Sequence, residues 1–282
     1  MKYVSFYDGG HVRPGLLEDN RIIAIACESL IEYVALPEGE RAARHTNETL
    51  ALLDDARLAA PVRPPKNVFC VGRNYLEHAK EGARALGREL KLPEVPTFFS
   101  KAPTAIADPD ATLQFSARVS QEMDWEGELA VVIGSRVKDA SEADAMDAVF
   151  GYTCVNDITA RDLQRAHMQF LKGKSLDGSC PMGPWIVGKE DIPDPHRLQL
   201  SLRVNGRRKQ QANTDQMIFK IPRLIAELSK GMTLEPGDVI ATGTPDGVGF
   251  ARTPPEFFQD GDIVEIEIQK IGTLRNTVRI SP

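Results

Sequence analysis

Apolar residues along most of the chain alternate with polar ones or form short continuous runs, and both patterns predict strands rather than long helices. Asn205-Gly206 adds a turn signal, because these two residues readily take the positive φ angles of a type I′ hairpin. The segments predicted as strands are 2–7, 21–26, 67–72, 128–134 and 151–157, together with hairpins at 198–210 and 263–280.

Fewer segments have helical spacing or helix-capping residues. Ser141-Glu142-Ala143-Asp144, for example, has the form of a capping box, and Gly231 suits the end of a helix. The predicted helices are 29–35, 47–58, 141–149, 159–170 and about 220–230. Many strands, few helices and frequent Gly and Pro turns predict an α+β fold that is mostly β, a β-sandwich or roll with peripheral helices.

A proline-rich stretch divides the chain. Residues 60–66 (APVRPPK) hold three prolines within five positions, which favours a stiff extended connector. The sequence therefore predicts a small N-terminal α/β module over 1–60 and a larger domain over 66–282.

Composition sets outer bounds on the function. The 282 residues include 34 Lys and Arg against 40 Asp and Glu, for a net charge of −6, and 42% are hydrophobic, as in an ordinary globular protein. The absence of a basic block argues against a nucleic-acid partner. No window resembles a signal peptide or a membrane span, which predicts no membrane partner. Cys70 and Cys154 stand in apolar runs, which favours buried reduced thiols and a cytoplasmic protein. The four widely spaced cysteines do not have the spacing of a zinc site.

Two Glu-x-Glu pairs occupy different sequence settings. Glu126 and Glu128 share one face of a strand whose continuation, 129–133, is apolar on both faces, so a cation or a proton is needed to neutralise them. Glu265 and Glu267 instead alternate with apolar residues, which predicts one core face and one solvated face. Only the first pair is a candidate metal site.

Asp157 is a third candidate carboxylate, at the end of the predicted strand 151–157 and just before a predicted helix. Its position suits a helix cap as well as a metal ligand, and the residues alone leave both readings open. Three carboxylates without a thiolate or histidine would select a hard cation, namely Mg²⁺, Mn²⁺ or Ca²⁺.

Several motifs in order resemble the fumarylacetoacetate hydrolase family. They are NVFCVGRNYLEHAKE (67–81), FFSKAPTA (98–105), WEGELAVVIG (125–134), GYTCVNDITARDLQ (151–164), KGKSLDGSCPMGPW (172–185), VNGRRKQQANTDQMIF (204–219) and LEPGDVIATGTPDGVG (234–249). The resemblance covers 66–282 and implies a catalytic β-roll or sandwich, usually a homodimer. It also implies that Glu126, Glu128 and Asp157 hold a divalent ion, most simply Mg²⁺, which binds a 2-oxo acid.

The same resemblance implies roles for other residues. His78 and Glu81, three positions apart on a helix, would form a general-base dyad on a lid at 76–96, and Lys174 would stabilise a developing oxyanion. The other four histidines have no such setting. The substrate-facing positions that the motifs imply are Arg73, Tyr75, Arg161, Gln164, Gly243 and Thr244.

Three functions are consistent with these residues. The leading expectation is a metal-dependent hydrolase that cleaves a carbon–carbon bond in an acylpyruvate-type 2,4-dioxo acid, with water activated by His78 and Glu81. In both this reading and the alternative, the metal would stabilise an enolate of the 2-oxo acid. The alternative proceeds without attack by water, as a decarboxylase of oxaloacetate or as an isomerase, tautomerase or hydratase of a 2-oxo acid. A non-catalytic cation- or metabolite-binding protein is the third.

Overall fold

Strands form two large sheets in the computed structural model, which describes residues 1–282. In the larger sheet, β5 pairs with β1 and β8 with β14, beside the main path. That path runs β4 (His45–Leu52), β3 (Arg21–Ile25), β2 (His11–Glu18), β1 (Lys2–Asp8), β14 (Cys180–Gly188), β12 (Val149–Asn156), β11 (Gly127–Ile133), β17 (Val239–Ala241), β6 (Val68–Gly72) and β7 (Thr97–Lys101), with β5 at Leu58–Ala59 and β8 at Ile106–Ala107.

The smaller sheet contains both predicted hairpins. Its strands follow the order β16 (Arg207–Asn213), β15 (Gln199–Val204), β18 (Ile263–Ile268), β19 (Gly272–Ser281) and β9 (Thr112–Ser116), while β10 (Met123–Asp124) pairs with β13 (Thr159–Ala160). Asn205 and Gly206 both have positive φ angles, as the type I′ hairpin requires. The fold is therefore α+β and mostly β, as predicted.

Strand β11 lies at the centre and is buried on both faces. Leu129, Val131 and Ile133 pack in one cluster with side chains of β15, β18 and β19. Ala130 and Val132 point to the other side, into a second cluster that includes residues of β1 and α1. A carboxylate at the start of this strand is consequently withdrawn from water, which is why β11 matters to the site.

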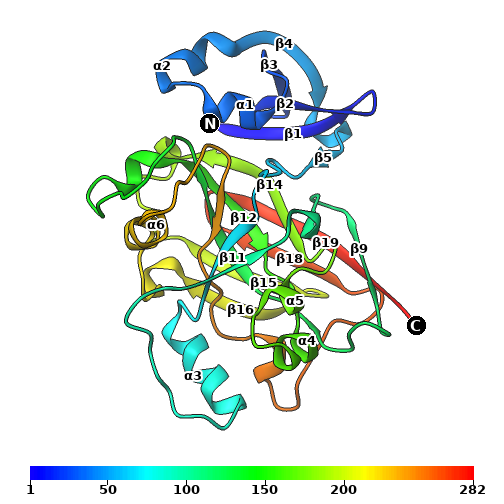
Figure 1. Ribbon diagram of the computed structural model, residues 1–282. Coiled ribbons are helices and arrows are strands. Elements are labelled where there is room, and N and C mark those ends of the chain that lie inside the picture. The colour runs from blue at the N-terminus through cyan, green and yellow to red at the C-terminus, as the bar shows by residue number, and fades with distance from the viewer.

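The first sixty residues extend the larger sheet. They form β1–β5, and Lys2 and Tyr3 of β1 pair with Val187 and Ile186 of β14. Figure 1 shows these blue strands at one end of the molecule and α3 at the opposite end. The division into a module at 1–60 and a domain at 66–282 stays a prediction.

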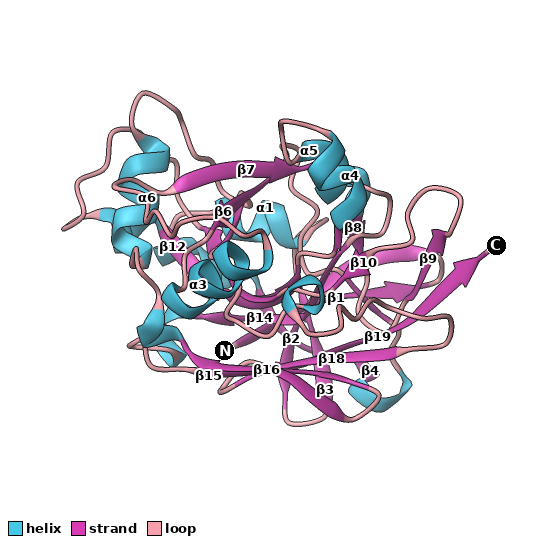
Figure 2. Ribbon diagram, turned by 90° about the horizontal axis from the view of Figure 1, so that it is seen from below, coloured by secondary structure: helices cyan, strands magenta, loops and turns pink.

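Six short α-helices lie outside the sheets: α1 (Leu30–Ala35), α2 (Glu38–Arg41), α3 (Leu76–Ala85), α4 (Arg161–Ala166), α5 (Leu171–Lys174) and α6 (Ile221–Ser229). Figure 2 views the molecule from below and shows α3 in front of the sheets. The predicted helix at 220–230 is confirmed, and Gly231 has the positive φ that ends it. None of these helices is long and apolar enough to cross a membrane.

Three helix predictions need correction. Segment 47–58 is a strand, β4, then a 3-10 turn and β5, because pairing with β3 satisfies its backbone and overrides the local helical spacing. Ser141 and Asp144 hydrogen-bond as in a cap, but only a 3-10 turn at Ala145–Ala148 follows before the chain enters β12. Segment 159–170 is split, with α4 ending at Ala166.

Candidate functional site

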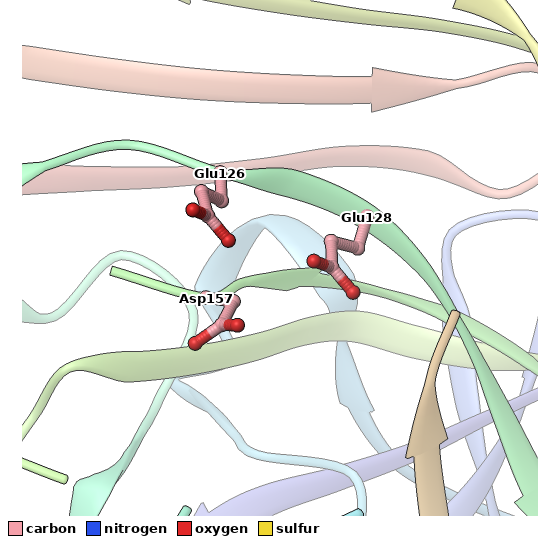
Figure 3. A group of neighbouring side chains, drawn as sticks. All are labelled: Glu126, Glu128 and Asp157. Carbon is pink, nitrogen blue, oxygen red and sulfur yellow. The ribbon is translucent and has the colours of Figure 1, made fainter. Parts of the chain in front are cut away.

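The three candidate metal ligands meet at the start of β11 and the end of β12. Gly127 pairs with Asn156 across these strands, and the amide of Asp157 donates to the carbonyl of Glu126 at 2.8 Å. One carboxylate oxygen from each of Glu126, Glu128 and Asp157 lies within 4.8 Å of the other two. Figure 3 shows the three carboxylates turned toward one another, and all three residues are buried.

Asp157 does not cap the helix that follows it. Helix α4 begins at Arg161, its N-cap position is Ala160, and no side chain caps it. Both oxygens of Asp157 instead accept from lysines, Oδ1 from Lys101 Nζ at 2.8 Å and Oδ2 from Lys174 Nζ at 2.7 Å. Of the two readings that the sequence left open, the structure thus excludes the cap.

Lys174 bridges two of the carboxylates. Its Nζ also donates to Glu126 Oε2 at 2.7 Å, and its side chain is almost completely buried. Burial opposes the charged ammonium, but Asp157 and Glu126 outweigh that effect and raise the pKa of Lys174 to about 12. Lys172, two residues earlier, is exposed. The structure therefore separates the buried Lys174 from its exposed neighbour Lys172.

Arg161 links the cluster to a fourth buried carboxylate, Asp124. The Arg161 guanidinium donates to Asp124 Oδ2 at 2.8 Å, to Glu126 Oε1 at 2.6 Å and to Gln164 Oε1 at 3.1 Å. Burial alone would raise the pKa of Glu126, but Lys174 and Arg161 lower it to about 2. Glu126 is thus held in its charged form.

Unlike Glu126, Glu128 has no basic partner, and its surroundings show whether a cation fits the site. Its one hydrogen bond comes from the amide of Gly243 to Oε2 at 2.8 Å. Burial, and then repulsion from Asp157 and Glu126, raise the pKa of Glu128 well above its usual value. The four buried carboxylates carry −4 against +3 on Lys101, Lys174 and Arg161. An oxygen-only donor set with an uncompensated negative charge fits a hard divalent cation.

Gly243 supports this arrangement through its backbone. Its φ of +103° suits glycine, and a Cβ there would lie 2.7 Å from the Cβ of Asn74. Only glycine therefore brings this amide up to Glu128. Because the amide donates to Glu128 in the structure, the implied contact of Gly243 with a substrate carboxylate stays a prediction.

His78 and Glu81 form the predicted pair on α3. His78 Nδ1 lies 2.9 Å from Glu81 Oε1, and Glu81 Oε2 accepts the amide of Gly247 at 2.9 Å. The two side chains are only 11% and 16% exposed. With its carboxylate held on both sides, Glu81 fixes the orientation of the imidazole and leaves Nε2 of His78 as the nitrogen free to exchange a proton.

One cavity of about 860 Å³ brings the carboxylate cluster and the dyad together. Helix α3 and the segment that follows it, residues 86–91, form part of its wall. The predicted site residues that line it are Arg73, His78, Glu126, Glu128, Arg161, Gln164, Lys174 and Thr244. Glu81, Asp157 and Gly243 lie behind this lining and reach it through the hydrogen bonds given above.

Tyr75 and Thr244 have different surroundings from each other. The Tyr75 ring is part of the hydrophobic core and its buried hydroxyl has no hydrogen-bond partner. Thr244 lies on the cavity wall, where its hydroxyl accepts from Gln210 at 2.8 Å and donates to the carbonyl of Gly127 at 3.1 Å. Contact with substrate stays a prediction for both.

Three residues near the site were missed by the sequence reasoning. Lys101 is fully buried at the end of β7, and Asp124 directly precedes the Trp-Glu-Gly-Glu segment. His167, one of the four histidines to which the sequence assigned no role, lines the cavity. The available signal was weak, since Lys101 and Asp124 merely stand inside or beside quoted motifs.

Both the sequence and the fold are similar to those of a known protein family. Residues 67–279 match the sequence profile of the fumarylacetoacetate (FAA) hydrolase C-terminal domain. The chain belongs to the fumarylacetoacetate hydrolase family. It is similar to a solved structure of fumarylacetoacetate hydrolase from psychrophilic Exiguobacterium antarcticum, with a TM-score of 0.86, 40% identity and 99% of each chain covered.

Two relatives with named activities correct the expected reaction. The chain is 46% identical to oxaloacetate tautomerase YisK of Bacillus subtilis, over 89% of this chain and 86% of the relative. It is 42% identical to mitochondrial oxaloacetate tautomerase fahd2 of Xenopus laevis, over 84% of this chain and 73% of the relative. The expectation of a carbon–carbon hydrolase is therefore wrong. It failed because a base, a cation site and an oxyanion-stabilising lysine serve any reaction that passes through an enolate, with or without attack by water.

Proposed function

We propose that this member of the fumarylacetoacetate hydrolase family is a divalent-cation-dependent tautomerase that interconverts the keto and enol forms of a small 2-oxo acid of the oxaloacetate type. The observation that carries the proposal is that His78, oriented by Glu81, lines the same cavity as Glu126 and Glu128. A base thus lines the same cavity as the carboxylates that would hold the cation. The names of the relatives support the same reaction.

Glu126, Glu128 and Asp157 would hold the cation, with Mg²⁺ as the first ion to test and Mn²⁺ and Ca²⁺ as alternatives. When held there, a divalent ion would supply a Lewis acid that stabilises negative charge on the oxygens of a 2-oxo acid. Lys101 and Lys174 orient the ligands by their hydrogen bonds to Asp157. The cavity lining then decides which acid enters.

Tautomerisation requires only proton transfers. In the keto-to-enol direction a C3–H bond breaks, its electron pair becomes the C2–C3 double bond, and the C2 oxygen takes up a proton from solvent, to which His78 later releases the proton from C3. His78 Nε2 accepts the C3 proton while Nδ1–H donates to Glu81, which stabilises the resulting imidazolium. The reverse direction returns the proton to C3. Because no bond to water forms, the dyad acts on carbon in this mechanism.

Positive charges near the cluster favour an anionic substrate. Lys174 lies on the cavity wall and places a permanent charge close to where oxygen becomes negative. Arg161 and Gln164, also on the wall, are hydrogen-bonded to each other, which fixes both side chains. We propose these residues, with Arg73 and Thr244, as the substrate-contacting set. A homodimer and a cytoplasmic location stay predictions.

The direct test follows the loss of ultraviolet absorbance as enol-oxaloacetate converts to the keto form, with purified protein and Mg²⁺. The wild-type protein should accelerate the conversion above the buffer rate, and chelation should remove the acceleration. His78→Ala should lower kcat about 100-fold or more, since positioned general bases contribute roughly 10² to 10⁴. His11→Ala, an exposed histidine far along the chain from the site, is the matched control.

Product analysis separates the proposal from its neighbours. If pyruvate and carbon dioxide appear as fast as the enol disappears, the enzyme is a decarboxylase and the tautomerase proposal is wrong. Full activity in His78→Ala would remove the dyad from the mechanism.

A further inference from the structure

We infer that the rim of the same cavity, formed by the exposed charged residues Arg73, Arg88, Glu89 and Lys91, selects 2-oxo acids that carry a second carboxylate. Arg73 and Arg88 bind this distal carboxylate. The inference rests on the proposed function for the identity of the reacting end of the substrate. It goes further by assigning specificity to residues at the mouth of the cavity. Arg88 lies in the segment after α3 and has no role in the proton transfers described above.

Charge at the bottom of the cavity accounts for only one carboxylate. On the wall there or buried behind it, Asp124, Glu126, Glu128 and Asp157 contribute formal charges of −4, while Lys101, Lys174 and Arg161 contribute +3. With a divalent cation bound the sum is +1, which matches the single carboxylate of the reacting end. All of these side chains already have partners, so a second anionic group would have no unpaired cation there.

The rim provides what the bottom lacks. Arg73, Arg88 and Lys91 line the cavity, are exposed, and form no ion pair with any carboxylate of the chain. The acid among the rim residues is Glu89, so the rim sums to +2. Arg165 also lines the cavity, but Glu122 neutralises it at 2.7 Å. Unpaired guanidinium groups at the mouth of a cavity attract and bind carboxylates.

The backbone of Arg73 adds a geometric argument. Arg73 follows β6 with φ of 55°, an uncommon conformation for a residue other than glycine, asparagine or aspartate. Its side chain makes a single long contact, from Nη2 to Thr97 Oγ1 at 3.4 Å. Most guanidinium donors of Arg73 are therefore free, while the turn holds the residue on the cavity wall. Such conformations are retained where a side chain has to be placed.

The test compares a dicarboxylate with its ester. Enolisation of oxaloacetate and of its 4-methyl ester is measured by C3 proton exchange in D₂O, and binding of L-malate and its 4-methyl ester is measured by calorimetry with Mg²⁺ present. Arg88→Gln and Arg73→Gln should each raise KM for oxaloacetate about tenfold and weaken malate binding similarly, the loss of one charge-assisted contact. For Arg88→Gln, both ester values should change less than twofold, because the ester has no distal carboxylate for Arg88 to bind.

Arg84→Gln is the matched control, because Arg84 is an exposed arginine of α3 that does not line the cavity. Its values should equal those of the wild type. Wild-type protein that binds malate and its ester equally, or variants that weaken both ligands alike, would overturn the inference. Absence of enolisation with a retained preference for malate over its ester would instead refute the proposed function and leave the rim assignment supported.

Discussion

Two Glu-x-Glu pairs in this chain have the same spacing on a strand and opposite surroundings. Glu126 and Glu128 lead into β11, which is buried on both faces, and they are 4% and 1% exposed. Glu265 and Glu267 lie on β18, where Val264, Ile266 and Ile268 take the core face and the glutamates face outward. The spacing sets which face a side chain takes, and the neighbouring strands decide whether that face contains water.

The difference extends to the partners of each pair. Glu126 is paired with Lys174 and Arg161, both buried, and Glu128 depends on a backbone amide. Glu265 has one exposed partner, Arg275, at 3.7 Å. A charge added or removed at the buried pair changes the free energy of folding strongly, whereas water screens Glu265 and Glu267, the outer pair. The comparison therefore predicts large effects at the first pair and very small ones at the second.

Neutralising one glutamate of each pair gives the largest expected contrast. Glu128→Gln should abolish measurable Mg²⁺ binding in calorimetry and lower tautomerase activity on the order of 1,000-fold, because an amide replaces a charged ligand of the cation. Glu267→Gln, with the same change of atoms on β18, should leave both values unchanged. Circular dichroism checks that both variants fold. If Glu128→Gln bound Mg²⁺ with wild-type affinity, Glu128 would not be a ligand of the cation, and the expected contrast with Glu267 would also be wrong.

Lys174 and Lys172 extend the comparison of buried and exposed charges to basic residues. Lys174→Met should lower the free energy of unfolding by about 3 kcal/mol when a chelator keeps divalent ions away from the protein. The change removes the ammonium group that Glu126 and Asp157 share and leaves both carboxylates buried. Lys172→Met, at an exposed position, should change that free energy by less than about 0.5 kcal/mol. Urea denaturation measures both. Equal, small effects would mean that the remaining lysine and arginine suffice to stabilise the cluster.

The sequence correctly predicted strands β11 and β18 and which of their side chains are buried, because both depend on the pattern of apolar and polar residues. Continuous apolar residues at 129–133 predicted a strand covered on both faces, and that prediction identified Glu126 and Glu128 before any fold was known. The Val264–Ile268 pattern predicted the solvated pair equally well. Both are local consequences of side-chain direction along a strand.

Contacts between distant segments were beyond the sequence. Segment 47–58 has helical spacing, and only the presence of β3 beside it makes it a strand. Lys101 reaches Asp157 from 56 positions away, and no local pattern encodes that contact. The reaction was misjudged for a related reason. His78, Glu81 and Lys174 specify an environment for an enolate, while the fate of that enolate depends on the substrate.

Asp108 is a buried carboxylate with several donors, and it tests whether burial or partners set the behaviour of the inner glutamates. Burial alone would raise its pKa, but the Ala60 amide, the Tyr7 hydroxyl and Arg63 together lower the pKa of Asp108 below its ordinary value of 3.8. The pKa of Glu128, with one donor and two carboxylate neighbours, is raised. Partners therefore decide the direction.

Asp108→Asn should cost about 2 kcal/mol in the free energy of unfolding at pH 7. Because the folded pKa is lowered, the native carboxylate binds fewer protons than the unfolded one, so its contribution is present above pH 3.8 and is lost as pH falls below that value. The difference between wild type and variant should shrink accordingly in thermal melts below pH 4. Asp110→Asn, at an exposed neighbouring position, is the control. A difference that stays constant with pH would show that the hydrogen bonds matter and the charge does not.

The smallest effect is expected at the outer pair itself. Glu265 and Arg275 are directly opposite on β18 and β19, with side chains 35% and 47% exposed and 3.7 Å between their charged atoms. A double-mutant cycle with Glu265→Gln and Arg275→Gln should give a coupling energy below about 0.5 kcal/mol, falling further in 0.5 M salt, since water and ions screen an exposed pair. A coupling above about 1 kcal/mol that persists in salt would mean that β18 keeps its outer face drier than its burial pattern indicates. The same spacing would then have similar energetic weight on both strands, and the contrast with β11 would no longer depend on solvent.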